Sequence, residues 1–295
     1  MNMKEKNQAN CSGEYRQMMY SKGKRKSADV SVIIPVYNSG KEAYRAVKSA
    51  ALQTLLPQEV ILIDDCSPKK QETEQWMQTI KRKFSSCFDV TVIQQKLNEG
   101  PGCARNEGWD KARCQYIAFL DSDDVWHPQK LECQFRYMKE HPQVWLSCHH
   151  MKVIQDENAF DREMVSTDSL KIVKINPIRY LFKHYPKGGT PSVMIKNTDK
   201  IRFQKGKRYS EDYLVWLQYC FTYEAVLIDM CLAASFKDFY GAGGLSANLW
   251  RIEKGELDTL ATIRDMRYIG FLVWLAASIF SLAKFVRRVI ISELR

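Results

Sequence analysis

Short apolar runs alternate with longer stretches of helical periodicity over the first 120 residues of the chain. The runs predict strands at 30–36, 59–63, 89–94 and 116–120, and the stretches between them predict helices at 40–53, 70–84 and 101–112. Strands that alternate with helices form a parallel sheet with helices on its faces. The pattern therefore predicts an α/β fold with a mostly parallel central sheet.

The pattern becomes mixed after this point. A helix is expected at 128–140 and a strand at 143–148, followed by less regular sequence that leads to an apolar run at 191–195. Further along, Ser210 is placed to cap a helix in which Leu214, Leu217 and Phe221 share one face. The regular alternation of strands and helices thus extends only through the first half of the chain.

Polar residues follow the first two predicted strands, at the edge where ligands of open α/β sheets bind. The first strand ends in Pro35, Val36 and Tyr37, and the second is followed by Asp64 and Asp65. Structural explanations are also available, because Tyr37 can pack in the core and the two aspartates can cap the following helix. The likeness of the two strand ends favours a binding role.

The most acidic strand end follows the apolar run at 116–119 and contains Asp121, Ser122, Asp123 and Asp124. Three carboxylates this close together repel one another unless a cation neutralises them. The simplest such cation is a divalent metal that holds a phosphorylated ligand. A solvated turn, or the cap of the helix that follows His127, is the structural alternative.

A third segment combines glycines with a proline and an arginine. Gly100 and Gly102 allow a backbone to approach a ligand closely, and Pro101 between them suits the first turn of a helix. Arg105 then lies within that helix, where it can contact a phosphate or remain an ordinary surface arginine. The segment therefore has the parts of a phosphate-binding helix start.

An acidic pair, Glu211 and Asp212, precedes a Leu-x-Trp-Leu run in the second half of the chain. A well-capped core helix accounts for the same residues without any chemistry. In their order and spacing, however, the strand ends, the glycine segment and the acidic pair resemble glycosyltransferase family 2. These proteins are inverting nucleotide-sugar transferases with the GT-A fold, which is Rossmann-like.

The resemblance covers roughly residues 29–245 and implies a domain organisation. A GT-A domain is expected at 29–250, with a nucleotide-sugar-binding half at 29–127 and an acceptor half at 128–250. A flexible basic arm at 1–28 would precede it, and a helical segment at 251–295 would follow it. The sequence of the acceptor half does not identify the acceptor.

The resemblance also implies a donor site. Asp65 would accept a hydrogen bond from a uracil ring, and Asp121 would bind the ribose or assist a metal. Asp123 would be the direct ligand of a Mg²⁺ or Mn²⁺ ion bridging two phosphates, with Asp124 in a supporting role. The implied donor-binding residues are Pro35, Val36 and Tyr37 as the base wall, Asp65, Gly100, Arg105 facing phosphate or base, Asp121 and Ser122.

The acidic pair would carry the chemistry at the acceptor. The resemblance implies that Asp212 is the general base, because an acceptor hydroxyl must lose its proton as it attacks the anomeric carbon. Glu211 would support this residue or bind the acceptor. A single displacement of this kind inverts the anomeric centre and needs no carboxylate nucleophile, which argues against a glycosidase.

Composition agrees with an intracellular enzyme of this size. The chain has 295 residues, and its hydrophobic content of 45% is sufficient for a core. Nine cysteines are scattered without a Cys-x-x-Cys pair, so we expect reduced thiols and neither a disulfide framework nor a zinc site. The adjacent His149 and His150 follow an apolar run, and we interpret them as a strand end with no metal role.

The net charge of +10 is concentrated in part at the amino terminus, where residues 1–29 carry seven basic and three acidic side chains. This polar arm lacks the apolar region of a signal peptide. No nucleic-acid recognition motif accompanies it, so nucleic acid is not an expected partner. An anionic membrane surface is the expected partner instead.

The carboxyl terminus supports that expectation. Residues 268–283 are uncharged but fall short of the ~20 residues of a membrane span. Lys284, Arg287 and Arg288 follow, and Lys284, Arg288 and Arg295 share a helical face, as an interfacial helix requires. We expect a peripheral or monotopic helix. A helix docked on the protein's own core, or a homodimer contact, is the alternative.

Together these features predict an inverting, metal-dependent transferase that uses a UDP-sugar. A saccharide or lipid-linked acceptor is expected, in the synthesis of lipopolysaccharide, O-antigen or capsule at the cytoplasmic face of the inner or plasma membrane. No Gln-x-x-Arg-Trp motif follows the acidic pair, which disfavours a processive synthase. The alternative function is a non-catalytic sugar- or nucleotide-binding module that retains the fold.

Overall fold

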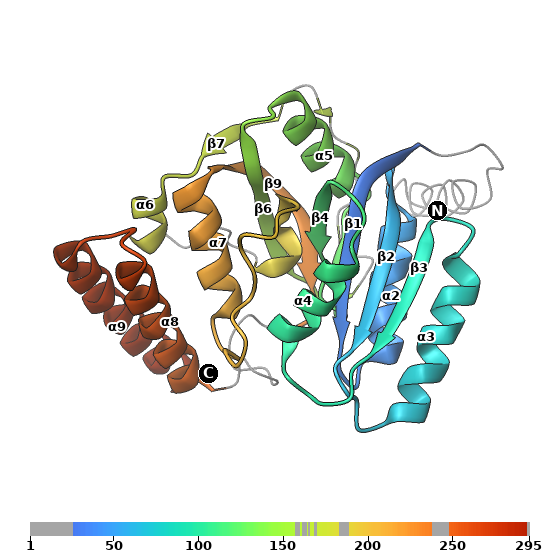
Figure 1. Ribbon diagram of the computed structural model, residues 1–295, viewed down its shortest axis with the longest axis horizontal. Helices are drawn as coiled ribbons and strands as arrows, with labels where there is room; N and C mark the ends of the chain where they lie inside the picture. The colour runs from blue at the N-terminus through green and yellow to red at the C-terminus, as the bar shows by residue number, and fades with distance from the viewer. Residues whose placement is uncertain are drawn as a thin grey trace, which may run out of the picture.

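The computed structural model describes residues 26–156, 160, 164, 166, 167, 170–182, 189–237 and 248–293. All but the last few residues of the expected basic arm at 1–28 lie outside this described part. The described residues form a central sheet with helices on both faces, and a pair of helices at one side of the molecule (Figure 1).

The elements expected in the first half are all present, with bounds that differ by a few residues. They are β1 (Ser27–Val36), α2 (Gly40–Ala51), β2 (Leu56–Asp64), α3 (Lys70–Phe84), β3 (Asp89–Gln94), α4 (Pro101–Lys111) and β4 (Tyr116–Phe119). Pro101 occupies the first turn of α4, as its fixed φ angle favours. The apolar runs and the turn residues that bound them were therefore sufficient to predict this half.

The second half contains shorter strands among its helices. Its elements are β5 (Asp124–Trp126), α5 (Lys130–Glu140), β6 (Val144–Val153), β7 (Ile172–Lys174), α6 (Pro177–Phe182), the 3-10 helix η3 (Thr190–Ser192), β8 (Met194–Lys196), α7 (Glu211–Thr222), β9 (Glu224–Ser235), α8 (Leu249–Asp265) and α9 (Phe271–Glu293). The sequence pattern did not predict β5, which starts within the acidic strand end.

The described sheet has the order β3-β2-β1-β4-β8-β6-β9-β5, and β7 pairs with β9. Strands β1 to β4 are parallel, as expected. The remainder is mixed, because β8 runs antiparallel to β4 and β6, and β5 and β7 run antiparallel to β9. Strand β5 follows β4 without a crossover helix, so it cannot pair with β4 in parallel and instead extends the far edge.

Two hydrophobic clusters fill the space between the sheet and its helices. Alternate residues of β1 enter different clusters: Val32 packs with α2, α3 and α5, whereas Ile33 packs with α4 and α7. On the second face, the rings of Phe119, Phe203 and Trp216 meet with centroids 5.4–5.8 Å apart. Trp109 of α4 packs against the first two of these rings, so the cluster joins α4 to α7, and both helices begin at the candidate site.

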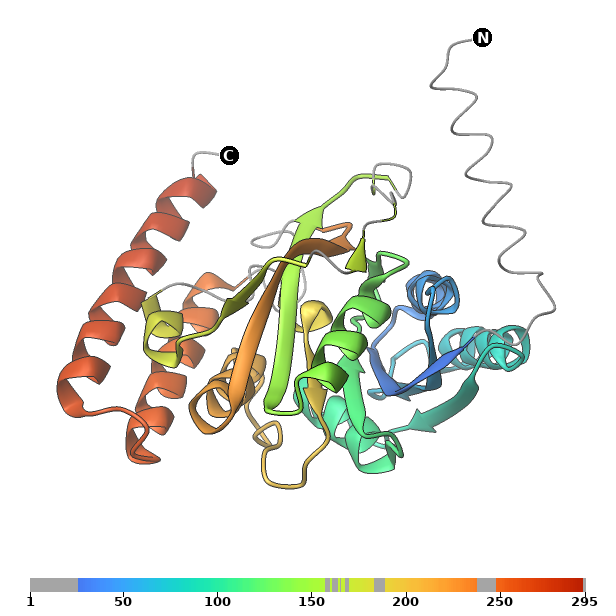
Figure 2. The same ribbon diagram turned by 90° about the horizontal axis from the view of Figure 1, so that it is seen from above.

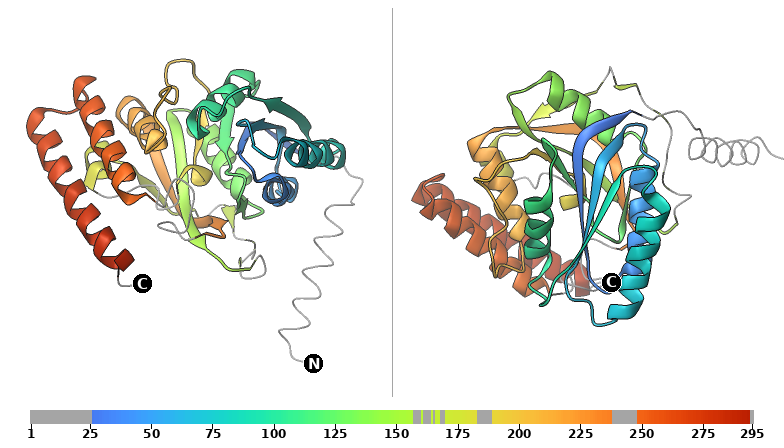
Figure 3. Two further views of the ribbon diagram at one scale, coloured as in Figure 1. Left: turned by 90° about the horizontal axis from the view of Figure 1, so that it is seen from below. Right: turned by 45° about the vertical axis from the view of Figure 1, so that its right-hand side comes forward.

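Helices α8 and α9 lie beside α7, and α9 is the outermost element on that side (Figure 2). The views from below and from an oblique angle place this pair on the opposite side from α2 and α3 (Figure 3). Within the described residues, no helix combines the length and the apolar character needed to cross a membrane.

Candidate functional site

The candidate site lies where the loops after β1, β2 and β4 meet the first turns of α4 and α7. The backbone N–H of Asp65 donates to the carbonyl of Val36, at 2.9 Å, and joins the first two strand ends. The hydroxyls of Ser39 and Ser122 lie 2.7 Å apart and join the first strand end to the acidic one. Residues from three strand ends thus converge, as expected for the carboxyl edge of a parallel sheet.

Asp65 anchors the turn that precedes α4. Its two carboxylate oxygens accept the backbone N–H groups of Glu99 and Gly100, at 2.9 and 3.0 Å. Burial raises the pKa of this carboxyl, and the two N–H groups oppose the rise. Gly100 has a φ angle of 92°, which side chains other than hydrogen rarely tolerate. The predicted contact between Asp65 and uracil stays a prediction, and support of this turn is an additional role.

Arg105 connects the acidic strand end to the acidic pair. Its buried guanidinium donates to Asp121 Oδ1 at 2.7 Å and to Glu211 Oε1 at 2.9 Å. Gly102 permits this approach, because a Cβ atom there would lie 3.0 Å from the Glu211 side chain. Both terminal nitrogens of Arg105 therefore face carboxylates, whereas its predicted contact with phosphate or base stays a prediction.

The two carboxyls that Arg105 binds have unusual protonation behaviour. Burial raises the pKa of Glu211 to about 7, and the neighbouring Asp212 adds to the rise while Arg105 opposes it. Burial also raises the pKa of Asp121, with Arg105 again opposing and with Asp123 and Asp212 adding to it. The charges of both the acidic strand end and the acidic pair therefore act on the pKa of Asp121. This shows that the two groups of acidic residues lie close enough to interact electrostatically.

Asp123 is a partly exposed carboxylate of the acidic strand end. Its Oδ2 atom lies 2.7 Å from Nζ of Lys237, and its backbone carbonyl accepts from Arg45 at 3.2 Å. Arg45 in turn stacks on the ring of Phe236, with its guanidinium carbon 3.5 Å from the ring centroid. The end of β9 and helix α2 thus hold the loop that carries Asp123.

Asp124 does not cap a helix. It is the first residue of β5 and pairs with Ser235 of β9, whose side chain also hydrogen-bonds its carboxyl. Burial, with the charges of Asp121 and Asp123, raises the pKa of Asp124 well above its usual value. These contacts fit the supporting role expected for Asp124, and they fix the direction of the chain after Asp123.

The metal ion expected at Asp123 stays a prediction. No group of three or more His, Cys, Asp or Glu side chains within them is arranged to hold a metal ion. The Asp123 carboxylate nevertheless suits a hard divalent cation, and an ammonium group already lies against it. Magnesium commonly takes one or two protein carboxylates, with phosphate oxygens and water completing its shell. The residues present fit a cation that arrives with a diphosphate.

Asp212 lies in the first turn of α7, where two groups orient its carboxylate. The Thr190 hydroxyl donates to Oδ2 at 3.0 Å, and the backbone N–H of Tyr213 donates to Oδ1 at 2.8 Å. Ser210 does not cap this helix as predicted, because it has a left-handed φ of 54° and its hydroxyl donates to Ile252 of α8. Contact with another helix therefore replaces the local cap.

The predicted base wall divides between core and surface. Tyr37 is 52% exposed, whereas Val36 is fully buried in the core beneath α2. Only Tyr37 of these two can therefore present its side chain to a ligand. The base-wall assignment of Pro35, Val36 and Tyr37 stays a prediction.

Sequence patterns did not indicate several residues that contact the site. These are Arg45, Arg208 and Lys237. Arg208 donates to the backbone carbonyl of Asn98 at 2.8 Å and packs against Gly100. Each comes from a segment that lacks a strand-end motif, so only tertiary structure brings it to the site. A basic residue directly after β9, such as Lys237, was the one available signal.

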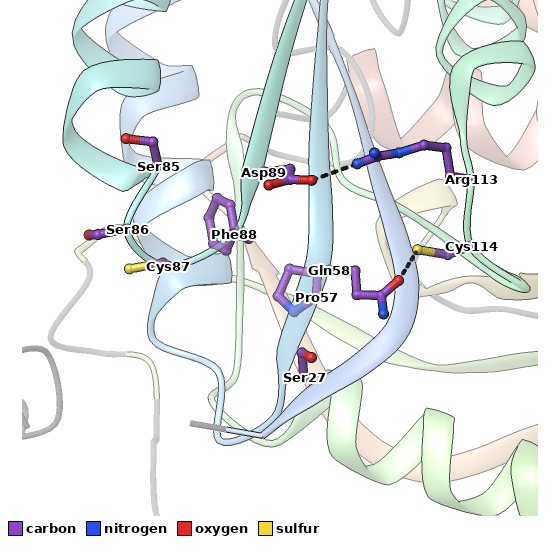
Figure 4. Close-up of a pocket in the computed structure, with 10 residues that line it drawn as sticks. All are labelled: Ser27, Pro57, Gln58, Ser85, Ser86, Cys87, Phe88, Asp89, Arg113 and Cys114. Atoms are coloured by element: carbon purple, nitrogen blue, oxygen red, sulfur yellow. Dashed lines mark hydrogen bonds and ion pairs between the residues drawn. The ribbon is translucent and has the colours of Figure 1, made fainter. Parts of the chain in front are cut away.

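A separate hollow lies at the opposite edge of the sheet, near the start of β1 and β2 (Figure 4). Arg113 closes it by pairing with Glu59 at 2.9 Å and Asp89 at 2.7 Å, and the Cys114 thiol donates to Gln58. The charges that line this hollow are therefore largely neutralised. None of the predicted site residues lines it.

Comparison with known proteins agrees with the predicted fold and family. The family model for Glycosyl transferase family 2 matches residues 31–204, which is more than half of the chain. The chain therefore belongs to glycosyltransferase family 2. The match ends shortly before the acidic pair at Glu211 and Asp212.

Curated relatives resemble part of the chain. An uncharacterized glycosyltransferase of Rickettsia felis is 38% identical over 126 residues, which is 42% of this chain and 19% of that protein. The putative teichuronic acid biosynthesis glycosyltransferase TuaG of Bacillus subtilis is 32% identical over 141 residues, which is 48% of this chain and 54% of TuaG. The matched region thus spans about half of TuaG and a smaller share of the Rickettsia protein.

Solved structures of S. aureus TarS share the fold. TarS 1-349 in complex with UDP-GlcNAc aligns with a TM-score of 0.60 at 20% identity, covering 79% of this chain and 66% of that chain. Full TarS aligns with a TM-score of 0.61 at 19% identity, covering 88% of this chain and 43% of that chain. The likeness confirms the predicted GT-A fold.

Proposed function

We propose that this protein transfers a sugar from a UDP-sugar to a saccharide or lipid-linked acceptor, with inversion, during the synthesis of a cell-surface glycan. The observation that carries the proposal is Arg105, which bridges Asp121 and Glu211. This bridge joins the acidic strand end, where a donor diphosphate is expected, to the acidic pair, where an acceptor is expected. A donor half and an acceptor half joined in this way would hold the two substrates close together, as transfer of a sugar between them requires.

The donor side has groups suited to a nucleotide. Exposed Tyr37 can stack on a base, and the turn at Gly100 brings backbone close to a ligand without a side chain in the way. TarS was solved with UDP-GlcNAc and with UDP, which supports a uridine nucleotide for a protein of the same fold. The donor sugar is left open by these features.

Asp123 would hold a Mg²⁺ or Mn²⁺ ion against the two phosphates, with Asp121 and Asp124 supporting the loop. When bound, this ion would stabilise the negative charge that develops on the leaving diphosphate. Lys237 contacts one oxygen of the Asp123 carboxylate, and the second oxygen is available to a cation. The ammonium would then lie beside the same diphosphate and add positive charge there.

Asp212 would accept the proton of the acceptor hydroxyl. Thr190 and the start of α7 hold its carboxylate in one orientation, which reduces the entropy lost when the acceptor is positioned. No residue is required to form a covalent sugar intermediate, so one displacement gives the inverted product. Glu211 stays bound to Arg105 and keeps the base next to the donor half.

The printed name of TuaG refers to teichuronic acid biosynthesis, and this supports a role in assembling a surface polymer. The rival function, a binding module without activity, predicts donor binding and no turnover. Incubation of the full chain with Mn²⁺, UDP-sugars and lipid-linked or soluble saccharides separates the two. We expect release of UDP that depends on acceptor, and a product whose anomeric configuration by NMR is opposite to that of the donor.

Thermal stabilisation by UDP with Mn²⁺, but no transfer to any acceptor, would favour the binding module. A product of retained configuration would contradict inversion.

A further inference from the structure

Helix α9 presents an apolar face to solvent along its length. Its exposed large side chains are Phe271, Leu272, Leu275, Ile279, Leu282, Val286 and Ile290, each between 40 and 78% exposed. They recur at spacings of three and four residues, so they lie on one side of the helix. A contiguous exposed surface of this kind marks an interaction site.

Lys284 and Arg288 share a helical face, as predicted from the sequence, but this face packs on α8 and does not face solvent. Lys284 donates to Glu256 at 3.1 Å, and Arg288 contacts both Glu253 and Glu256 at 3.0 Å. Glu253 is fully buried between the two helices. These basic side chains are therefore neutralised inside the hairpin that α8 and α9 form, and other residues must supply any charge at the surface.

The hairpin retains a second set of basic residues without such partners. Within residues 248–290, every acidic side chain has a basic partner: Glu253 and Glu256 as described, Asp258 with Lys207, and Asp265 with Arg264. Within the same described range, Arg251, Lys254, Arg267 and Arg287 are exposed and have no carboxylate partner. The charge left on the hairpin surface is therefore positive.

Two of these charges border the apolar face. Arg287 follows Val286 on α9, and Arg267 lies in the turn just before Phe271. Trp250 is 58% exposed and its ring lies 5.6 Å from that of Phe285, so the start of α8 reaches the side of α9. Lys254 is exposed in the same part of α8, whereas Arg251 donates to the Tyr209 hydroxyl at 3.4 Å. Aromatic side chains and positive charge thus flank an apolar strip.

We infer that α9 and this basic border bind the surface of a bilayer containing anionic lipids. An apolar strip with arginine, lysine and tryptophan beside it matches the acyl chains, the anionic headgroups and the region between them. Charge complementarity selects this occupant over a second copy of the chain, because two such borders would repel each other. The helix lies along the surface, consistent with the absence of a spanning helix in the described residues.

The hairpin of α8 and α9 packs next to the candidate site, on the side of the acidic pair. Helix α8 packs on the segment that leads into the acidic pair: Ser210 donates to Ile252 at 3.3 Å, and Lys207 donates to Gly255 at 3.1 Å. Gly255 is needed for this contact, since a Cβ atom there would lie 2.6 Å from the Tyr209 carbonyl. A bound bilayer would therefore lie on the acceptor side. The lipid binding itself does not depend on the proposed transfer reaction.

Sedimentation with vesicles tests the apolar part. The full chain should sediment with vesicles of phosphatidylglycerol and phosphatidylcholine in equal parts, and Ile279→Asp should reduce this partitioning by roughly tenfold or more. Leu97→Asp is the matched control, because Leu97 is a 72% exposed apolar residue of another surface, and it should bind as wild type does. Equal loss in both variants, or no loss in Ile279→Asp, would overturn the inference.

A second variant tests the charge and does not disturb packing. Replacing Arg267 and Arg287 by Gln should weaken binding to the anionic vesicles by about fivefold for each charge removed, and binding to phosphatidylcholine alone should not change. High salt should release the wild type only in part, since apolar burial persists when charge is screened. If the wild type bound equally well to vesicles with and without phosphatidylglycerol, the inference of an anionic lipid partner would be wrong. Failure of the wild type to bind either vesicle, with a dimer in light scattering that Ile279→Asp separates, would assign the strip to a second copy.

Discussion

The ammonium of Lys237 lies 2.7 Å from the carboxylate of Asp123, at the strand end where a divalent cation is proposed. Arg45 holds the backbone of the same residue through its carbonyl oxygen. The loop therefore has its shape before any cation binds, and the ammonium reduces the repulsion among neighbouring carboxylates. Lys237 contacts one of the two oxygens of this carboxylate, so a cation that binds Asp123 would lie next to Lys237 and the end of β9.

Replacement of Asp123 by Asn should remove the charged ligand at nearly constant size. We expect turnover to fall at least ~100-fold, because the cation contributes several kcal/mol of charge stabilisation. The additional thermal stabilisation by UDP that depends on Mn²⁺ should also disappear. Asp199→Asn, a change at an exposed aspartate of another loop, is the control. Near-normal transfer by Asp123→Asn, or by wild type in excess chelator, would exclude Asp123 as a metal ligand.

Asp212→Asn should separate binding from chemistry. The amide cannot accept the acceptor proton, so transfer should fall by ~10²–10⁴-fold, whereas affinity for UDP with Mn²⁺ should stay near that of wild type. Titration calorimetry and initial rates measure the two quantities. The Thr190→Val variant, which removes the hydroxyl that orients Asp212, should show a smaller loss of rate. A parallel loss of donor affinity in Asp212→Asn would indicate that the residue is structural.

Asp65→Ala should affect uridine nucleotides more than guanosine nucleotides. The contacts from Asp65 to Glu99 and Gly100 are common to every ligand, so their loss should weaken all nucleotides to a similar extent. A contact with the uracil ring would add ~1.5–3 kcal/mol of loss for uridine nucleotides alone. Competition binding with UDP and GDP measures this difference. Equal weakening of both would restrict Asp65 to support of the turn.

The sequence predicted the parts of the structure that depend on local pattern. Strands β1 to β4 were recognised because apolar runs end at turn residues, and the helices between them have clear periodicity. Strand β5 was not recognised, since three residues beginning with Asp124 are too few for a pattern and Asp is rare in strands. Its existence depends on pairing with β9, which is distant in the sequence.

The contacts among the site residues, like the pairing of β5, depend on segments that are distant in the sequence. The sequence correctly placed the acids at strand ends, but the partners Thr190 and Lys237 come from segments with no recognisable motif. The inward direction of Arg288 could not be predicted either, because its partner Glu253 belongs to another helix. Residue type and spacing therefore indicate the chemistry of a site better than they indicate its full set of contacts.

Glu211 should make the stability of the protein depend on pH. Its pKa is about 7 in the folded protein, against the usual value of 4.5, so the folded state retains a proton that the unfolded state loses. The stability contribution of this proton is present in full below pH 4.5 and is lost as the pH rises to about 7. Glu211→Gln removes the titration. We expect the wild type to lose stability relative to this variant across that window in urea unfolding experiments. A constant difference between the two would show that Glu211 is ionised throughout.

Arg288→Met should strongly destabilise the protein in solution, because it leaves the fully buried Glu253 without its basic partner. Breaking one side of a buried pair typically costs ~3–5 kcal/mol. The adjacent Arg287→Met is a matched control: Arg287 is exposed and has no carboxylate partner among residues 248–290, so the change should be within about 0.5 kcal/mol. The double variant Glu253→Gln with Arg288→Met should recover part of the loss, since no ionised group then remains buried without a partner. Urea unfolding of all four proteins in the absence of lipid measures these differences. Equal stability of the Arg287 and Arg288 variants would mean that Arg288 faces solvent and that the hairpin carries more positive surface charge than inferred.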